Sequence, residues 1–138
     1  MTFRMLAITV IVSALVAQAG ACQDNGWTVV HTDANQVITV RPPVGELAAA
    51  GTLWVHGEYT ARPKFKGFKY ASEQYVAEVN CEAGMINRTD WKIYAKPKLQ
   101  GRARESTINF GIAWRIVPDT VDEWIAQAAC AQPPAKGR

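Results

Sequence analysis

A change in the spacing of apolar residues constrains the fold of this chain most. Between residues 27 and 117 the apolar residues recur mostly at every second position, which is the pattern of strands with one buried face. After Pro118 the spacing becomes that of a helix with one apolar stripe. The stripe consists of Val121, Trp124, Ile125 and Ala128. Strands followed by one helix predict an α+β fold: a single antiparallel sheet of about six strands with one C-terminal helix packed on one face.

Six segments carry the strand pattern, and the segments beginning at Ser72 and Thr107 alternate most strictly. Proline and glycine interrupt the chain between several of them. Gly45–Gly51 could form a helical turn or a loop, and we favour a loop; we expect a polar turn region at Lys96–Arg104. The expected strands are Trp27–Thr32, Val37–Arg41, Thr52–Thr60, Ser72–Glu82, Asn87–Ala95 and Thr107–Val117.

The first 21 residues have the layout of a secretory signal peptide. Arg4 gives a positive start, Met5–Val16 is almost wholly apolar, and Ala19-Gly20-Ala21 provides small residues at a cleavage site. The apolar stretch is too short to span a bilayer comfortably, which favours a signal peptide over a transmembrane helix. The expected division of the chain is a signal peptide at 1–21, one domain at 22–131 and a disordered tail at 132–138.

The chain contains three cysteines, and export would place them in an oxidising compartment where disulfides persist. Cys22 directly follows the cleavage pattern, and two alternatives stay open for it: a lipid-modified anchor or a free thiol. Ala19 stands three residues before Cys22, where bacterial lipoprotein signals usually have leucine. If Cys22 carries a lipid, Cys81 and Cys130 are the remaining pair. Their bond would close a loop of about 50 residues and contribute roughly 4 kcal/mol on the chain-entropy account.

The two cysteines of this pair differ in how easily they meet. Cys81 lies on the apolar side of the strand that begins at Ser72, so we expect it to face the core. Cys130 lies nine positions after Val121, which would aim it to the opposite side of an ideal helix. We therefore expect the helix to end or loosen before Cys130.

Length, composition and charge exclude several classes of protein. The chain has 138 residues, of which 49% are hydrophobic, which suits one folded domain and not a disordered chain. The formal net charge is +3, and the signal segment contributes one of these charges through Arg4. The remaining charge is too small to predict a nucleic-acid partner.

No catalytic, cofactor or metal site is predicted. His31 and His56 lie in separate strands without further ligands at metal spacing. The sequence also lacks a nucleophile elbow, a CxxC motif and a glycine-rich phosphate loop. A hydrolase assembled in space from residues such as His31, His56, Glu78 and Glu82 stays an alternative hypothesis.

Basic and aromatic residues alternate in one segment, 62–70, and a second basic cluster follows at 92–104. Such segments can bind polyanions, nucleic acid or glycans, but from the sequence we favour a pair of solvated loops whose lysines aid solubility and protect strand edges. Convergence of the two segments in space would favour binding. Trp54 and Trp91 are expected on the sheet face opposite the core, where exposed rings would mark a partner surface. The candidate binding residues are Lys64, Lys66, Phe68, Lys69, Trp54, Trp91, Lys96 and Lys98.

Short segments occur in a distinctive order between Trp27 and Cys130, and the most specific is Trp114–Thr120, followed by the helix. The others are Leu53-Trp54-Val55, Tyr59-Thr60, Tyr70-Ala71-Ser72 and Glu78–Glu82, with Arg88, Tyr94 and Gly101. In order and spacing they resemble the surface-adhesin protein E-like family of bacterial envelope proteins. The chain departs from the family in having Asn80 where an aspartate is common and Asp119-Thr120 where Gly-Ser is frequent.

The resemblance implies about six antiparallel strands with a C-terminal helix tied across one face by the disulfide. It implies a role as well, because the founding member is an outer-membrane adhesin that binds host matrix and serum proteins. We therefore expect a non-enzymatic binding module for a protein or an anionic polymer. We expect it in the periplasm or at the outer-membrane surface of a Gram-negative-type bacterium, touching membranes only through an N-terminal lipid. The alternative is an accessory periplasmic domain that acts by self-association, for example as a homodimer.

Overall fold

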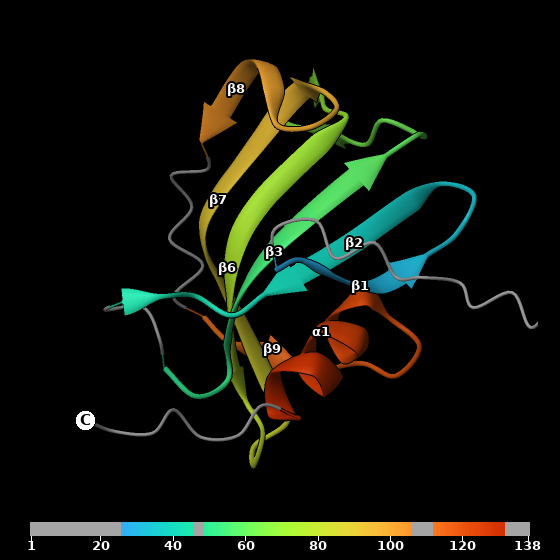
Figure 1. Ribbon diagram of the computed structural model, residues 1–138. Coiled ribbons are helices and arrows are strands. Elements are labelled where there is room, and N and C mark those ends of the chain that lie inside the picture. The colour runs from blue at the N-terminus through green and yellow to red at the C-terminus, as the bar shows by residue number, and fades with distance from the viewer. Residues whose placement is uncertain (1–25, 46–48, 106–111, 132–138) are drawn as a thin grey trace, which may run out of the picture.

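The computed structural model describes residues 26–45, 49–105 and 112–131 (Figure 1). The expected signal peptide, Cys22, the expected tail and residues 107–111 of the last expected strand lie outside the described residues. One long antiparallel sheet is present, with the strand order β1-β2-β3-β6-β7-β8, and a short strand β9 also pairs with β7. The helix α1, Val121–Cys130, follows the last strand. The predicted α+β architecture is confirmed.

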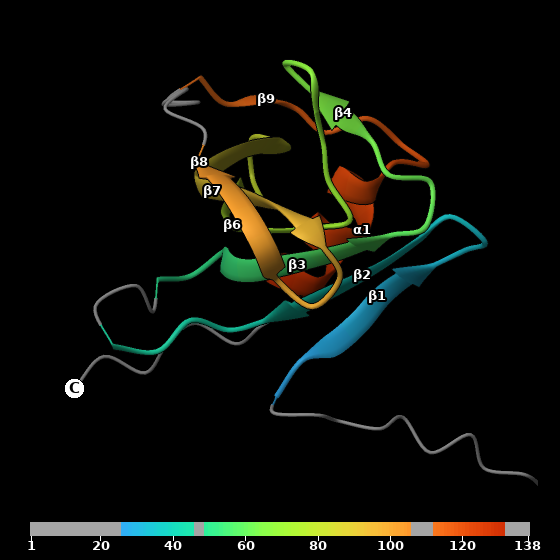
Figure 2. The ribbon, with the colours of Figure 1, turned by 90° about the horizontal axis from the view of Figure 1, so that it is seen from above.

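The strands of the sheet twist strongly between β1 at one edge and β8 at the other, as the view from above shows (Figure 2). A separate two-stranded hairpin, β4–β5, is inserted between β3 and β6. The strand bounds are β1 Thr28–Thr32, β2 Gln36–Arg41, β3 Thr52–Tyr59, β4 Lys64–Phe65, β5 Phe68–Lys69, β6 Ser72–Asn80, β7 Met85–Lys96, β8 Gln100–Glu105 and β9 Trp114–Arg115.

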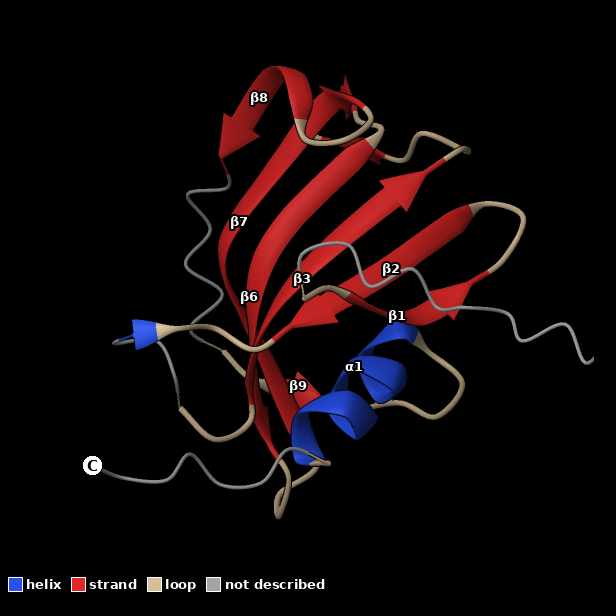
Figure 3. Ribbon diagram, in the orientation of Figure 1, coloured by secondary structure: helices blue, strands red, loops and turns tan. Residues whose placement is uncertain are grey.

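The main core lies between α1 and one face of the sheet (Figure 3). Alternate residues of β2, β3 and β6 turn to this face, as the period-two pattern predicts, because successive side chains of a strand point to opposite sides. Burial of each such aliphatic side chain contributes about 1.5–3 kcal/mol. The buried residues are Ile38, Val40, Leu53, Val55, Tyr75, Ala77, Val79 and Ile86 of the sheet and Ile125, Ala126 and Ala129 of α1.

Cys81 and Cys130 form a disulfide bond with their Cα atoms 5.9 Å apart. We expected the helix to end or loosen before Cys130. This expectation is wrong, because the helix continues through Cys130. Cys81 is also not a core residue: it is exposed and lies in the turn after β6. Because Cys81 stands beyond the end of the strand, Cys130 does not have to face the sheet to reach it.

Two further expectations, both for the C-terminal half of the chain, are corrected. The expected turn region at Lys96–Arg104 contains strand β8, which pairs with β7. Of the described part of the expected strand at Thr107–Val117, only Trp114–Arg115 is a strand. Ile112 is 81% exposed, whereas Trp114 and Ile116 of the same alternating set are partly buried and pack against the core.

Within the described ranges, no helix has the length and hydrophobicity needed to cross a membrane, and α1 has only ten residues.

Candidate functional site

The two basic segments come together at one end of the sheet. The β4–β5 hairpin follows β3 in the chain, beyond the upper end of that strand in Figure 1, and the second half of β8 contacts it. Arg104 of β8 donates a hydrogen bond of 3.2 Å from Nη1 to the carbonyl oxygen of Lys66 at the hairpin tip. The guanidinium carbons of Arg102 and Arg104 lie 5.0 and 5.3 Å from the centre of the Phe68 ring. We call the set Lys64, Lys66, Lys69, Arg102 and Arg104 the basic surface.

The hairpin is shaped by its turn and by a second apolar cluster. Lys66 and Gly67 both have positive φ, +46° and +78°, as a two-residue turn of the type favoured between strands requires. Phe65 and Phe68 pair across the hairpin, and Phe68 packs with Tyr70 and Ile93. Because strand side chains alternate, Lys64 and Lys69 are directed away from this apolar cluster. The basic surface therefore includes both sides of the hairpin, with Arg102 and Arg104 on the side of Phe68 and the two lysines on the other.

The charges of the basic surface are not neutralised by the described part of the chain. None of its five cations forms an ion pair with another described residue. Lys64 and Lys69 stand directly opposite each other in the hairpin register. Like charges at such positions destabilise a pair of strands, so an anionic partner would relieve this repulsion.

Phe68 lies beneath Arg102 and Arg104 and is not itself exposed. It is 4% exposed, so its ring does not face solvent as a binding residue would. Its ring instead holds two guanidinium groups through cation–π contacts, which restricts the positions of both.

Lys96 is the last residue of β7, and Lys98 lies within the turn that connects β7 to β8. Ser72 fixes this turn: its hydroxyl donates to the Lys96 carbonyl oxygen at 2.7 Å and accepts from the Leu99 amide at 3.0 Å. The backbone amide of Lys98 donates to Oε1 of Glu58 at 2.7 Å. A carboxylate therefore lies beside this turn, and we leave Lys96 and Lys98 outside the basic surface.

Trp91 does not lie on the face opposite the core, which corrects our expectation. Its indole nitrogen donates to Oε2 of Glu73 at 2.7 Å, and Glu73 is 4% exposed. A bulge causes the change of face, because Asp90 and Trp91 of β7 together stand opposite Tyr75 of β6.

The carboxylate of Glu73 organises this inner region. It accepts a second hydrogen bond, from the hydroxyl of Tyr59. Burial and the nearby Glu73 carboxylate raise the pKa of Tyr70 to about 12. These groups stabilise the fold beneath the hairpin.

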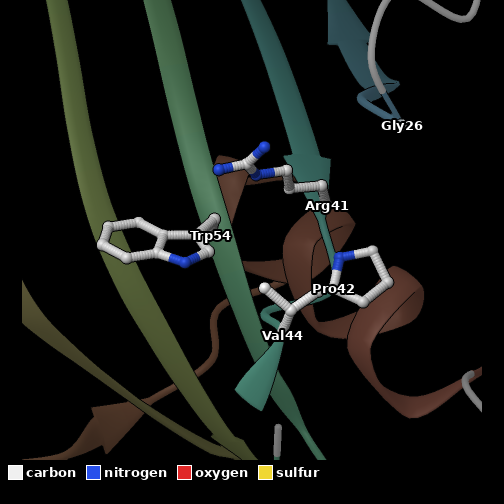
Figure 4. Close-up of a pocket in the computed structure, with 5 residues that line it drawn as sticks. All are labelled: Gly26, Arg41, Pro42, Val44 and Trp54. Carbon is white, nitrogen blue, oxygen red and sulfur yellow. The ribbon is translucent and has the colours of Figure 1, made fainter. Parts of the chain in front are cut away.

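Trp54 does lie on the sheet face opposite α1, as expected. It stands across from Arg41 of β2 in the register, and both side chains line a cleft of about 340 Å³ with Pro42, Val44 and Gly26 (Figure 4). We call it the Arg41 cleft. Pro42, Val44 and Trp54 make most of the cleft apolar, and Arg41 is its charged side chain.

Both histidines already have structural partners. His31 stacks on Trp124 with the ring centres 3.8 Å apart, and its Nε2 lies 2.9 Å from Oδ2 of Asp33. The contact with His31 and two backbone amides lower the pKa of Asp33 to about 2. His56 pairs with Glu58 at 2.7 Å.

The residues of the hydrolase hypothesis are not brought together. Glu78 accepts a hydrogen bond from Asn87, and Glu82 lies in the exposed turn after β6. Among the described residues, no group of three or more His, Cys, Asp or Glu side chains is placed to hold a metal ion.

Comparison with known protein families identifies the family of this chain. The model of the family described as surface-adhesin protein E matches residues 24–131. The chain belongs to the surface-adhesin protein E family. The match covers all nine strands and the helix, so the resemblance seen in the sequence is confirmed over the whole described fold.

A solved member of this fold supports the assignment. The chain is similar to the crystal structure of protein E from non-typeable Haemophilus influenzae, with a TM-score of 0.50 and 15% sequence identity. The similarity covers 78% of this chain and 77% of that chain. At this identity the similarity establishes the fold. No curated protein matches the chain at a significant level.

Proposed function

We propose that this protein is an exported, non-enzymatic adhesive module that binds an anionic polymer through the basic surface. The convergence of two basic segments that are distant in the sequence carries this proposal. Membership of the surface-adhesin protein E family supports the adhesive role. The signal-peptide pattern at 1–21 supports export, to the periplasm or the outer-membrane surface.

The arrangement of the cations suits a polymer with repeated acidic groups. Arg102 and Arg104 are two residues apart on one strand, so their Cα atoms are about 6.6 Å apart. Both guanidinium groups are restricted by the Phe68 ring, which lowers the entropy lost when they bind. A guanidinium binds carboxylate, sulfate or phosphate oxygens through two parallel hydrogen bonds. Lys64 and Lys69 add charge without such directional demands.

Titration with heparin, used as a sulfated polymer probe, tests the proposal. We expect saturable binding that weakens by about tenfold in each of two double variants, Lys64→Glu/Lys69→Glu and Arg102→Glu/Arg104→Glu. Arg115→Glu is the matched control, because Arg115 is an exposed cation on β9, outside the basic surface. An equal loss in the Arg115 variant, or no saturable binding by the parent chain, would reject the proposal. Retained binding to a matrix protein alone would redirect it to a protein partner.

Self-association is the second candidate. Within the described residues β1 pairs only with β2, and it carries an exposed apolar residue, Val29. An edge strand of this kind can pair with a second copy. Light scattering at increasing concentration distinguishes the two functions. A chain that stays monomeric and binds heparin supports polymer binding and contradicts self-association.

The maturation of the N-terminus belongs to the same proposal. Cleavage after Ala21 would leave Cys22 as the first residue, with a lipid or a free thiol. The intact mass of the protein isolated from its native envelope reports the cleavage site, the lipid and the oxidation state together. A mass that includes residues 1–21 would contradict export by this signal.

A further inference from the structure

The Arg41 cleft and the basic surface lie at opposite ends of β3. Trp54 is the third residue of β3, and the strand ends at Tyr59, from which the chain enters the β4–β5 hairpin (Figure 1). Five residue steps separate Trp54 from Tyr59, which is about 17 Å along the strand. A macromolecule held by the basic surface would therefore leave the cleft accessible to a different partner.

The chemistry of the cleft is that of one cation among apolar walls. The Arg41 guanidinium carbon lies 4.8 Å from the centre of the Trp27 ring, and Arg41 forms no ion pair with any described residue. Val44 at the cleft wall is 88% exposed. Figure 4 shows the Arg41 side chain beside Trp54, with Pro42 and Val44 below Arg41 in this view. This combination complements an amphiphile that has an anionic head and an apolar body.

The position of the start of the domain indicates which kind of amphiphile the cleft binds. Gly26 lines the cleft, and Cys22 precedes it by four residues, a reach of at most about 14 Å. Whatever holds the N-terminus is thus close to the cleft. Tryptophan prefers the headgroup level of a bilayer, and Trp27 and Trp54 both lie on this sheet face.

We propose that the Arg41 cleft docks this protein on an anionic phospholipid bilayer. The Arg41 guanidinium pairs with a lipid phosphate, the two indoles lie at headgroup depth, and Val44 enters the acyl region. This contact directs the basic surface away from the membrane. A single lipid chain anchors a protein only marginally, so the cleft supplies a second attachment if Cys22 is lipidated. The carboxylate on this face of β6 is Glu78. It accepts a hydrogen bond from Asn87 and stands two strands from Arg41, so it does not neutralise the Arg41 charge.

The experiment uses the chain from residue 22 with Cys22→Ser, because Met5–Val16 would itself bind vesicles. Partitioning is measured on phosphatidylcholine vesicles with and without phosphatidylglycerol. We expect binding that requires the anionic lipid and that Val44→Asp weakens by about tenfold, the factor for losing one buried apolar side chain. Arg41→Gln should weaken binding to the anionic vesicles. Val117→Asp is the matched control, because Val117 is another exposed valine and lies outside the cleft.

A second measurement decides the case in which the free chain binds too weakly. Cys22 is coupled to a maleimide lipid in vesicles whose acyl chains are brominated, and tryptophan quenching is recorded. Docking predicts quenching that Trp54→Phe and Val44→Asp both reduce. Absence of quenching in the tethered chain overturns the proposal.

Adsorption through the basic surface is the competing explanation. It predicts that Lys64→Glu/Lys69→Glu abolishes vesicle binding while Val44→Asp has no effect, and that result would also overturn the proposal. Heparin binding of the Val44→Asp variant should be unchanged. Failure of membrane docking therefore leaves the proposed polymer binding intact, and failure of polymer binding leaves the docking result intact.

Discussion

Arg88 of β7 donates a hydrogen bond of 2.7 Å from Nη2 to Oδ1 of Asp122 in α1. The other carboxylate oxygen of Asp122 accepts from the indole nitrogen of Trp114, also at 2.7 Å. The Arg88 guanidinium carbon lies 4.6 Å from the centre of the Tyr75 ring in β6. One carboxylate therefore connects the helix to both β7 and β9.

Replacement of Asp122 by alanine should lower the free energy of unfolding by about 2–3 kcal/mol. Removing one partner of a buried ion pair leaves the other charge uncompensated, at a cost of about 3–5 kcal/mol, and this pair is partly accessible, with side chains 25% and 15% exposed. Urea unfolding measures the change. Glu123→Ala is the control, because its carboxylate accepts only an exposed hydrogen bond from the Asp119 amide. Equal losses in the two variants would contradict a special role for Asp122.

Loss of the disulfide should destabilise the protein by about 2–5 kcal/mol. The two cysteines are 49 positions apart, and the crosslink restricts the unfolded chain over that loop. Both residues are exposed, so a reductant can reach the bond. Cys81→Ala, Cys130→Ala and the reduced parent chain should show similar melting temperatures, all below that of the oxidised parent. The Cys22→Ser variant, which keeps the bond, should melt with the oxidised parent.

Substitution of Phe68 should test whether its ring positions Arg102 and Arg104, because it leaves the charge of the basic surface unchanged. Phe68→Leu is expected to cost less than about 1.5 kcal/mol, because it preserves much of the buried volume. Heparin binding should nevertheless weaken, since Arg102 and Arg104 lose the ring that restricts them. Phe68→Ala should cost about 3–5 kcal/mol through the cavity it leaves. Unchanged heparin affinity in a folded Phe68→Leu protein would show that the ring does not position the arginines.

Asp33 should contribute to the free energy of unfolding at neutral pH and lose this contribution in acid. Its carboxylate accepts hydrogen bonds from the amides of Asn35 and Gln36 and contacts His31, and these contacts lower its pKa from 3.8 to about 2. A lowered pKa stabilises the folded state above the unfolded value, and the contribution is lost as the pH falls through the folded value. The difference in stability between the parent and Asp33→Asn should therefore be constant above about pH 5 and shrink toward pH 2. Chemical denaturation across this range measures it, and a difference that grows in acid would contradict the assignment.

The parts of the fold with one buried face could be predicted from the sequence. Ile38 and Val40 in β2 and Leu53 and Val55 in β3 alternate with more exposed residues and face the core. The helix stripe was equally readable, because Val121 and Ile125 do pack against the sheet.

Strand β8 could not be found in this way. All six residues of Gln100–Glu105 are exposed, so the segment has no apolar alternation. Its strand character comes from backbone pairing with β7, which leaves no pattern in the side chains.

The candidate site shows the same limit. The charge of the basic segments was visible in the sequence, but their convergence depends on β8 and on the contacts of Phe68. The face of Trp91 depends on the bulge at Asp90, which adds one residue and reverses the alternation after it. Arg41 gave no signal at all, because the cleft is formed by its neighbour across the register, Trp54, and by the chain start at Gly26.

The position of the disulfide has a mechanical consequence. A pulling force applied between the start of the chain and the β4–β5 hairpin would pass along the backbone through β1, β2 and β3, all of which precede Cys81. The segment closed by the crosslink, from Cys81 to Cys130, lies outside that load path. The bond would therefore protect the molecule against heat and denaturant, whereas its resistance to tension would rest on the hydrogen bonds that join β1, β2 and β3 to their neighbours in the sheet.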